Sequence, residues 1–470
     1  MQYYLETLER PAALCWTLKA KSSFLWDDRL PNREPIQKRV NIMSSQDIEL
    51  PGLLASFLER EFVLQTAREQ GAIQRERDFD PFLLLSILLL GFKQSTERTL
   101  SSLCRLYAQE ADKPLSDSAF RDRFNAGLEA CFQTLYLHLA QQVLALEGFT
   151  QGLLARFEEV LISDSTILTL NDTLAKLFPG VATPAAAKID LMISAQACSP
   201  AKVKICEGKR SDHALLEVRE WVEGKLMLFD LGYTSVALLA RIQRHKGFFV
   251  ARLKENANPT VVYDHLLQQK VDRTSFSDYL NTGYGKDFDL LCEFSYEKRI
   301  WRGKRRTVTC RFRVVCLWNT GNASWMWYVT NLPVEEFSAQ EIGVLYRARW
   351  LVEMVFNELK TGYGLDKFKV QNPHAIRVLI YAALMTLLVS RHLLLTLCRQ
   401  WKLQYVSLKS WWHLFCESLA KLLSILLDPG SWSLDKEKRL KSVWLKALKQ
   451  ARRKHPGLLE EVDRGIFYAK

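Results

Sequence analysis

The chain lacks the residue patterns that build structural zinc sites and disulfide frameworks. Its ten cysteines are scattered singly and none forms a Cys-x-x-Cys pair, which argues against both kinds of stabilisation. The eight histidines form no His-Glu-x-x-His motif or similar pair of ligands. A metal ion, if the protein uses one, should therefore be a hard cation held by carboxylates.

Long hydrophobic runs are also missing from the sequence. The longest apolar runs without a charge are residues 82–92 and 378–390, and both are shorter than the roughly 20 residues that span a bilayer. We therefore expect buried core helices at both places. The N-terminus shows no basic start followed by an apolar stretch, so no signal peptide is predicted. The expected location is the reducing cytoplasm, with no membrane partner.

Positive charge is what the chain has in excess. Its 64 Lys and Arg exceed its 52 Asp and Glu, which gives a net charge of +12 and a pI of about 9.1. This balance suits a polyanionic partner, either nucleic acid or an anionic membrane surface. The length of 470 residues is enough for two or three domains with sizeable cores.

Hydrophobic periodicity divides the chain into helical and β-rich parts. The pattern predicts an α/β protein in which strands and helices alternate and a β-rich insertion stands between two such parts. Helical regions are expected at both ends. The expected parts are an extension of unknown role (1–42), a helical domain (43–150), the first part of the core (151–257), the insertion (258–336), the second part of the core (337–400) and a basic helical region for dimerisation or DNA contact (401–470).

The stretch YRARWLVEMVFNELK, residues 346–360, is mostly apolar but carries four conspicuous polar residues. Tyr346, Arg349, Glu353 and Lys360 are spaced by three, four and seven, which would place them on one narrow face of an α-helix. The simplest interpretation is a buried salt bridge between Arg349 and Glu353. Because buried charges are costly unless each finds a partner, a functional site is the alternative.

Two aspartates stand within predicted strands. Asp164 lies inside the apolar run VLISDSTIL, and Asp230 ends the run LMLFD. Either could be a turn or capping residue, and the helix expected soon after Asp230 makes capping a serious alternative there. Together with Glu353 they would form a carboxylate triad able to hold two divalent ions, since Mg²⁺ prefers oxygen ligands. Two such ions suit displacement at a phosphodiester, with the cations and the phenol of the helix holding backbone phosphate.

This series of residues resembles the DDE transposases of bacterial insertion sequences. More narrowly, it resembles the group defined by a Tyr-Arg-Glu-Lys signature, insertion sequence family four. The resemblance rests on DSTILTL, FDLGY, YVTNLP and the spacing Tyr346-x2-Arg349-x3-Glu353-x6-Lys360, and it covers residues 50–400. It implies an RNase H-like catalytic core, a mixed sheet flanked by helices, with a β-rich insertion before the helix that carries the glutamate.

The resemblance also implies an activity. The triad would bind two Mg²⁺ or Mn²⁺ ions and act in catalysis, and the other three signature residues would contact phosphates near the cleaved end. The reaction implied is cut-and-paste transposition, by hydrolytic nicking, strand transfer and a hairpin on the element end. The implied partners are double-stranded inverted-repeat ends and target DNA, bound by a homodimer associated with the bacterial nucleoid.

A basic segment inside the insertion is a second candidate for DNA contact. KRIWRGKRR, residues 298–306, holds six basic residues in nine, and its glycine predicts a hairpin turn. Arg302, Lys304 and Arg305 would then lie near the tip. They could follow DNA phosphates, or they could be solvated charges that discourage aggregation at a sheet edge.

Two further features have a structural and a functional interpretation. Trp325 and Trp327 alternate on one face of a predicted strand, where core packing is the default and stacking on a flipped base is the alternative. Arg121 and Arg123 follow a cap at Ser116 or the next residue, in a helix of the region expected to bind element ends. That helix could enter a DNA groove or simply face solvent.

Two other functions fit parts of the pattern. A junction or repair nuclease with an RNase H-like fold would share the carboxylates, but the spaced signature argues against it. A domesticated DNA-binding protein without catalysis would share the basic charge, but the intact triad argues against it. The sequence therefore predicts an active insertion-sequence transposase.

Overall fold

The chain divides into two units, Met1–Gln46 and Asp47–Lys470. The computed structural model describes residues of the second unit. It covers residues 49–466 except 74–78, 92–98, 147, 149–151, 212–215, 234, 284, 300–304, 322, 367–368 and 455–456. The predicted extension 1–42 therefore lies outside the described residues.

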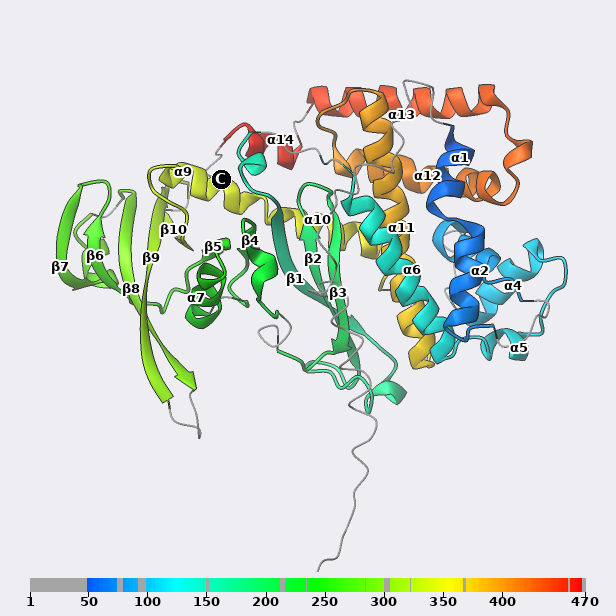
Figure 1. Ribbon diagram of the computed structural model, residues 1–470, viewed down its shortest axis with the longest axis horizontal. Coiled ribbons are helices and arrows are strands. Elements are labelled where there is room, and N and C mark those ends of the chain that lie inside the picture. The colour runs from blue at the N-terminus through cyan, green and yellow to red at the C-terminus, as the bar shows by residue number, and fades with distance from the viewer. Residues whose placement is uncertain are drawn as a thin grey trace, which may run out of the picture. The chain divides into compact units, whose positions relative to one another are not determined.

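One ten-stranded sheet runs through the second unit, in the order β3-β2-β1-β4-β5-β10-β9-β8-β6-β7 (Figure 1). In its first half β1, β4 and β5 are parallel, while β2 and β3 continue antiparallel from β1. These core strands are β1 (Val160–Thr169), β2 (Ala186–Ser194), β3 (Ser199–Glu207), β4 (Leu226–Phe229) and β5 (Phe248–Arg252). The predicted mixed sheet is confirmed.

The β-rich insertion continues the same sheet and does not form a separate layer. Its strand β10 pairs antiparallel with β5, and the remaining strands follow as antiparallel neighbours. The elements of the insertion are β6 (Thr260–Asp264), β7 (Gln269–Ser275), α8 (Phe276–Leu280), β8 (Phe288–Arg299), β9 (Arg305–Asn319) and β10 (Ser324–Thr330).

Helices from both ends of the chain share one hydrophobic core beside the sheet (Figure 1). The N-terminal ones are α1 (Leu50–Phe57), α2 (Arg60–Glu69), α3 (Pro81–Ser86), the π-helical η2 (Ile87–Gly91), α4 (Leu100–Glu110), α5 (Asp117–Arg121) and α6 (Ala126–Leu144). The C-terminal ones are α11 (Pro373–Gln400), α12 (Leu408–Leu427), α13 (Leu434–Lys454) and α14 (Leu458–Asp463). The flanking and terminal helices predicted from periodicity are thus present.

Among these, α11 is the centre of the helical body. It begins at an Asn372 cap followed by Pro373, a sequence suited to a helix start. Its 28 residues are long and apolar enough to cross a membrane, yet 94% of its most apolar window is buried inside the protein. The prediction that this run forms a core helix is confirmed.

The two faces of the sheet contribute to two different cores. Ile162 and Leu228 belong to the core shared with α10 (Trp350–Asn357) and α11, whereas Leu161 and Phe229 belong to a second core beneath α7 (Val236–Arg244). Successive side chains of a strand point to opposite faces. Asp164 therefore lies on the same face as Ile162, the face that α10 covers.

Candidate active site

Asp164 and Asp230 are neighbours on adjacent parallel strands. Ser163 of β1 lies opposite Phe229, the last residue of β4. Asp164 and Asp230 are the residues that directly follow this pair. Neither aspartate caps a helix, but Asp230 does open a turn, because its carbonyl accepts from the N–H of Tyr233 at 3.1 Å. The strand continues to Thr169 beyond the first aspartate, and the cap of α7 is Ser235 rather than the second.

The signature residues do not lie on one regular helix. Tyr346 is in α9 (Ala339–Arg347), Arg349 is in a turn, Glu353 is in α10 (Trp350–Asn357) and Lys360 is in the π-helical η9 (Glu358–Gly362). Around the turn, backbone hydrogen bonds join residues three apart. Tight and wide helical turns change the rotation per residue, so the single regular helix expected here is wrong, although Tyr346 and Arg349 both contact a strand aspartate.

Arg349 lies between two of the three carboxylates. Its Nη2 donates to Oε1 of Glu353 at 2.5 Å, and its Nη1 lies 3.9 Å from Oδ2 of Asp164. The hydroxyl of Tyr346 lies 3.5 Å from Oδ1 of Asp230, as a long hydrogen bond. The salt bridge expected from the spacing is present, and the same guanidinium also faces a strand carboxylate.

Burial has the largest effect on the pKa values of the Asp164 and Tyr346 side chains. Burial raises the pKa of the Asp164 carboxyl to about 6, and the charges of Glu353 and Asp230 add to this effect. Burial also raises the pKa of the Tyr346 phenol, which keeps it a neutral donor. Oε2 of Glu353 is buried without a hydrogen-bond partner. The site thus holds more negative charge than its arginine neutralises.

These donors fit a hard divalent ion in their chemistry. Carboxylate oxygens are the ligands that Mg²⁺ prefers, and a buried oxygen without a partner is an unusual feature that needs an explanation. As placed, no three His, Cys, Asp or Glu side chains among the described residues are grouped closely enough to hold an ion. The cation that stands among the carboxylates is Arg349.

A buried ion pair that the sequence did not predict anchors the end of the signature segment. Glu358, the first residue of η9, pairs with Arg391 of α11 at 2.5 Å, and both side chains are almost fully buried. The hydroxyl of Tyr363 donates to the same glutamate, and the arginine also donates to the carbonyl of Cys198. A charge inside each apolar run was the available signal, but sequence alone does not show that the two charges pair.

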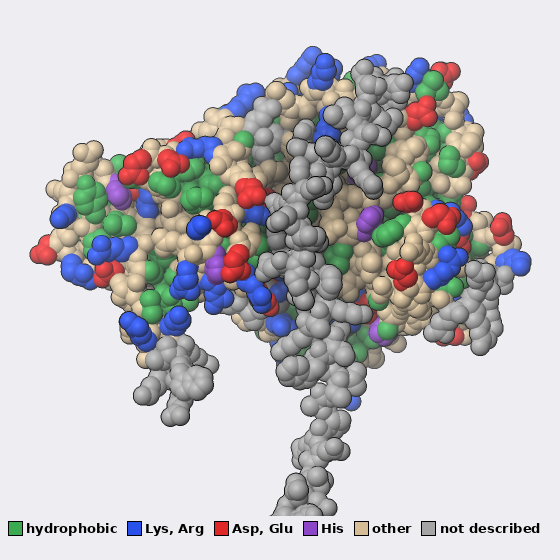
Figure 2. All heavy atoms as spheres, viewed as in Figure 1, with side chains coloured by type: hydrophobic (Ala, Val, Ile, Leu, Met, Phe, Trp, Pro, Cys, Tyr) green, Lys and Arg blue, Asp and Glu red, His purple; other side chains and the backbone are tan. Residues whose placement is uncertain are grey.

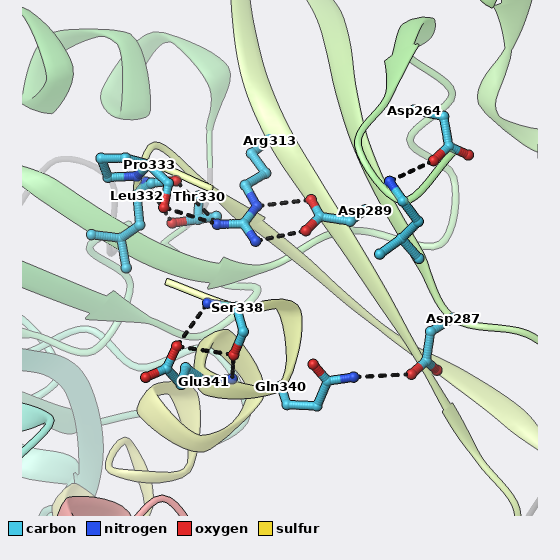
Figure 3. Close-up of polar contacts among 11 residues, drawn as sticks. Asp264, Asp287, Asp289, Arg313, Thr330, Leu332, Pro333, Ser338, Gln340 and Glu341 are labelled. Carbon is cyan, nitrogen blue, oxygen red and sulfur yellow. Dashed lines mark hydrogen bonds and ion pairs between the residues drawn. The ribbon is translucent and has the colours of Figure 1, made fainter. Parts of the chain in front are cut away.

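A second buried pair ties the insertion to the start of α9. Figure 3 shows Arg313 of β9 donating to both oxygens of Asp289, at 2.6 and 2.8 Å, and to the carbonyls of Leu332 and Pro333. A few residues later, Ser338 caps α9 in a reciprocal capping box with its third residue. The insertion therefore helps to fix where the signature segment begins.

The C-terminal helix α14 closes the other side of this region. Glu461 pairs with Arg347 at 2.6 Å, and Arg347 also donates to the carbonyl of Ile466. Asp463 accepts from the backbone N–H of Leu154, which lies just before β1. The helix α14 thus joins the end of α9 to the segment before β1.

The two tryptophans are packed against the second core. Trp325 Nε1 donates to the carbonyl of Lys286, and its ring meets Trp318 edge to face at 4.8 Å. Trp327 meets Phe276 edge to face at 5.5 Å. Core packing, the default interpretation, describes both rings, and stacking on a base stays a prediction.

The other candidate DNA contacts are only partly described. Arg305 is exposed at the start of β9, and Figure 2 shows Lys and Arg side chains gathered at this end of the β8–β9 hairpin. Arg302 and Lys304 lie outside the described residues. Ser116 caps α5, whose Arg121 pairs with an acid of the same helix at 2.6 Å.

The comparison with known families decides what the site belongs to. A family described as "Transposase DDE domain" matches residues 155–389, a span that contains both aspartates and the whole signature segment. The chain belongs to the DDE transposases. The resemblance to this family seen in the sequence is confirmed, and the mixed sheet expected for its catalytic core is present.

The curated proteins that this transposase resembles are transposases of insertion sequences. It is 22% identical to the transposase of element IS231F from Bacillus thuringiensis subsp. israelensis, over 71% of this chain and 77% of the relative. It is 25% identical to the IS1151 transposase of Clostridium perfringens, over 63% and 70%. The solved piggyBac transposase synaptic complex with hairpin DNA is 11% identical over 87% of both chains, with a TM-score of 0.47. The protein is an insertion-sequence transposase, an enzyme that cleaves DNA and transfers strands.

Proposed function

We propose that this transposase moves its element by a cut-and-paste route, with a hairpin formed on the element end. One observation carries the proposal: Asp230 follows β4 beside Asp164 of β1, and Arg349 lies between Asp164 and Glu353 of α10. Hydrolysis and strand transfer at one phosphodiester need this kind of dense negative site. The expected partners are double-stranded inverted-repeat ends and target DNA, bound by a homodimer in the cytoplasm.

The three carboxylates are the proposed ligands of two Mg²⁺ or Mn²⁺ ions. Ions bound there would polarise the phosphodiester and activate the attacking oxygen. The buried Oε2 of Glu353 supports this role, because it has no protein partner. The partial burial of Asp164, with its side chain 26% exposed, limits the access of competing water.

The remaining signature residues are the proposed phosphate contacts. Arg349 presents two donors, Tyr346 is a neutral hydroxyl donor, and Lys360 lies half-buried on η9. Charge-assisted hydrogen bonds to phosphate are short and strong. They would hold the cleaved end in register with the carboxylates.

The β-rich insertion supplies the more distant proposed contacts. Arg302, Lys304 and Arg305 would follow the DNA backbone from the end of the β8–β9 hairpin. Trp325 or Trp327 would stack on a flipped base during hairpin formation, which offsets part of the cost of unstacking. Each ring would first have to leave its edge-to-face neighbour.

The test uses a duplex that carries the inverted repeat flanking the gene. Asp164→Asn, Asp230→Asn and Glu353→Gln should each lower Mg²⁺-dependent nicking at least about a hundredfold, a typical loss for a group that stabilises the transition state. Gel shifts should show unchanged end binding. Asp190→Asn is the matched control, because its carboxylate lies on β2 and accepts from Tyr233.

Two results would count against the proposal. Parental nicking by any variant of the triad would remove that residue from the proposed site. Denaturing gels that show only open linear ends, with no hairpin species, would leave cleavage intact but rule out the hairpin route.

A further inference from the structure

The guanidinium of Arg349 stands where a divalent cation would be expected. It reaches Glu353 at 2.5 Å and approaches Asp164 at 3.9 Å, and the charge of Asp230 also acts on it. Its side chain is only 15% exposed. The guanidinium is therefore held by the carboxylates and is not a solvated surface charge.

We propose that Arg349 acts as an internal counter-ion that competes with divalent metal for the carboxylates of the resting enzyme. The inference rests on the proposed metal-binding role of these carboxylates. It assigns to the arginine a function in the protein without DNA, in addition to its expected contact with phosphate. Metal binding then requires the guanidinium to give up at least one of its carboxylate partners.

Competition follows from the oxygens involved. Oε1 of Glu353 is the atom that Arg349 binds, while Oε2 of the same carboxylate is buried without a partner. A metal ion that used both oxygens of this carboxylate would bring two cations to one group. Two ligands that exclude each other weaken each other's binding by the same factor.

The two states of the arginine also differ in what they stabilise. Without metal, Arg349 separates Asp164 from Glu353 and offsets their repulsion. Removing one partner of a buried ion pair leaves the other charge uncompensated and destabilises the fold. A phosphate at the site would offer the guanidinium a bidentate partner in place of the carboxylates, so substrate binding would favour the released state.

A purely structural salt bridge makes the opposite prediction for metal. If the arginine only fastens the turn to α10, its removal should disturb the position of Glu353. Metal affinity should then fall or stay unchanged. Metal affinity therefore separates the two roles, whereas loss of stability alone does not.

The test is Mn²⁺ binding by the full chain without DNA, measured by isothermal titration calorimetry. Arg349→Met should lower the dissociation constant for Mn²⁺ by about tenfold, within the usual range of coupling between two ligands. Arg252→Met is the matched control, because this nearby guanidinium lies over the ring of Tyr328, 5.8 Å from its centre. The control should bind Mn²⁺ within about twofold of the parent chain.

Stability measurements keep the test decisive if the methionine variant folds poorly. Arg349→Lys retains the charge but offers a single donor group, so its Mn²⁺ affinity should fall between those of the parent and Arg349→Met. The gain in melting temperature on adding Mn²⁺ should be larger in both variants than in the parent. Equal or weaker Mn²⁺ binding by both variants would overturn the inference.

The same titration separates this inference from the proposed function. Asp164→Asn and Glu353→Gln should abolish the Mn²⁺ site that the parent shows. If they do so while the Arg349 variants bind like the parent, only the competition is wrong. If both bind Mn²⁺ like the parent, the proposed metal site itself is wrong.

Discussion

At the scale of single residues, His392 differs from the other buried polar groups near the centre of the helical body. Its ring stacks on Phe57 at 4.1 Å, and both ring nitrogens are buried without a hydrogen-bond partner. Burial lowers its pKa to about 4. The imidazole is therefore neutral in the folded protein and must become charged when acid unfolds it.

The pH dependence of stability follows from this shift. Between pH 6.5 and about 4 the unfolded chain binds a proton at His392 that the folded chain does not, so stability falls as the pH falls. The loss is at most about 3 kcal/mol. Urea unfolding of His392→Leu and the parent at pH 7.5 and 4.5 should show a smaller loss in the variant. An equal loss in both proteins would show that other groups govern the acid sensitivity.

The residues of the site were predictable from sequence only in part. Asp164 and Asp230 could be singled out, because a charge inside an apolar strand pattern requires a reason. The bond from Arg349 to Glu353 could be predicted from their spacing. The approach of Arg349 to Asp164 could not, since it depends on how a helix packs against a strand.

At the scale of elements, the signature segment is held in place at its C-terminal end by α11 and α12. The π-helical turn η9 is fastened to α11 through Glu358 and Arg391, and both side chains are almost completely buried. Gly362 ends this turn against Trp412, where a Cβ atom would lie 2.3 Å from the indole nitrogen. The ion pair and the glycine together define the end of the segment that carries Glu353.

Removing one member of this pair should be severe. Arg391→Met should lower the free energy of unfolding by about 3–5 kcal/mol, because it leaves the Glu358 carboxylate buried and unpaired. The double variant Arg391→Met, Glu358→Leu should recover much of that loss, since it leaves no buried charge. Urea titrations of the two variants and the parent provide the comparison. A double variant no more stable than the single one would mean that the pair mainly fixes local geometry.

The hairpin of β2 and β3 shows how far local patterns predict an element. The stretches IDLMISAQAC and AKVKICEG predict two strands joined by a turn at Ser199 and Pro200. The turn instead spans residues 195–198, with Cys198 at a positive φ of 50°, and Pro200 lies within β3. A proline is tolerated there because β3 is an edge strand, where one side needs no ladder hydrogen bonds.

At the scale of the whole molecule, segments that are far apart in the sequence pack into one sheet and one shared helical core. The insertion was expected as a set of hairpins, but its place in the central sheet depends on the pairing of β10 with β5. The N-terminal and C-terminal helices share one core. Contacts between segments that are far apart in the sequence leave no signal in local periodicity. The fold class was therefore predictable, whereas these contacts were not.

The outer face of α13 should contact DNA without regard to sequence. Lys446, Lys449 and Arg453 are exposed along it, opposite the buried Trp444 and Leu448. Changing the three cations to Gln should make the slope of log affinity against log salt shallower by about 0.9 for each phosphate that is no longer neutralised. Melting temperatures should hardly change, because exposed substitutions alter stability little.

A charge-matched variant on the opposite side of the sheet serves as the control for α13. Arg241, Arg244 and Lys246 are exposed at the end of α7, and changing them to Gln should leave the salt slope as it is. An unchanged slope for the α13 variant would show that its cations only face solvent.

The small helix α14 links folding to the order in which the chain is made. It ties Leu154, just ahead of β1, to Arg347 at the end of α9, through Asp463 and Glu461. A ribosome synthesises all three carboxylates of the site long before it synthesises this helix. The contacts that join the start of β1 and the end of α9 through this helix can therefore form only after α14 has left the ribosome.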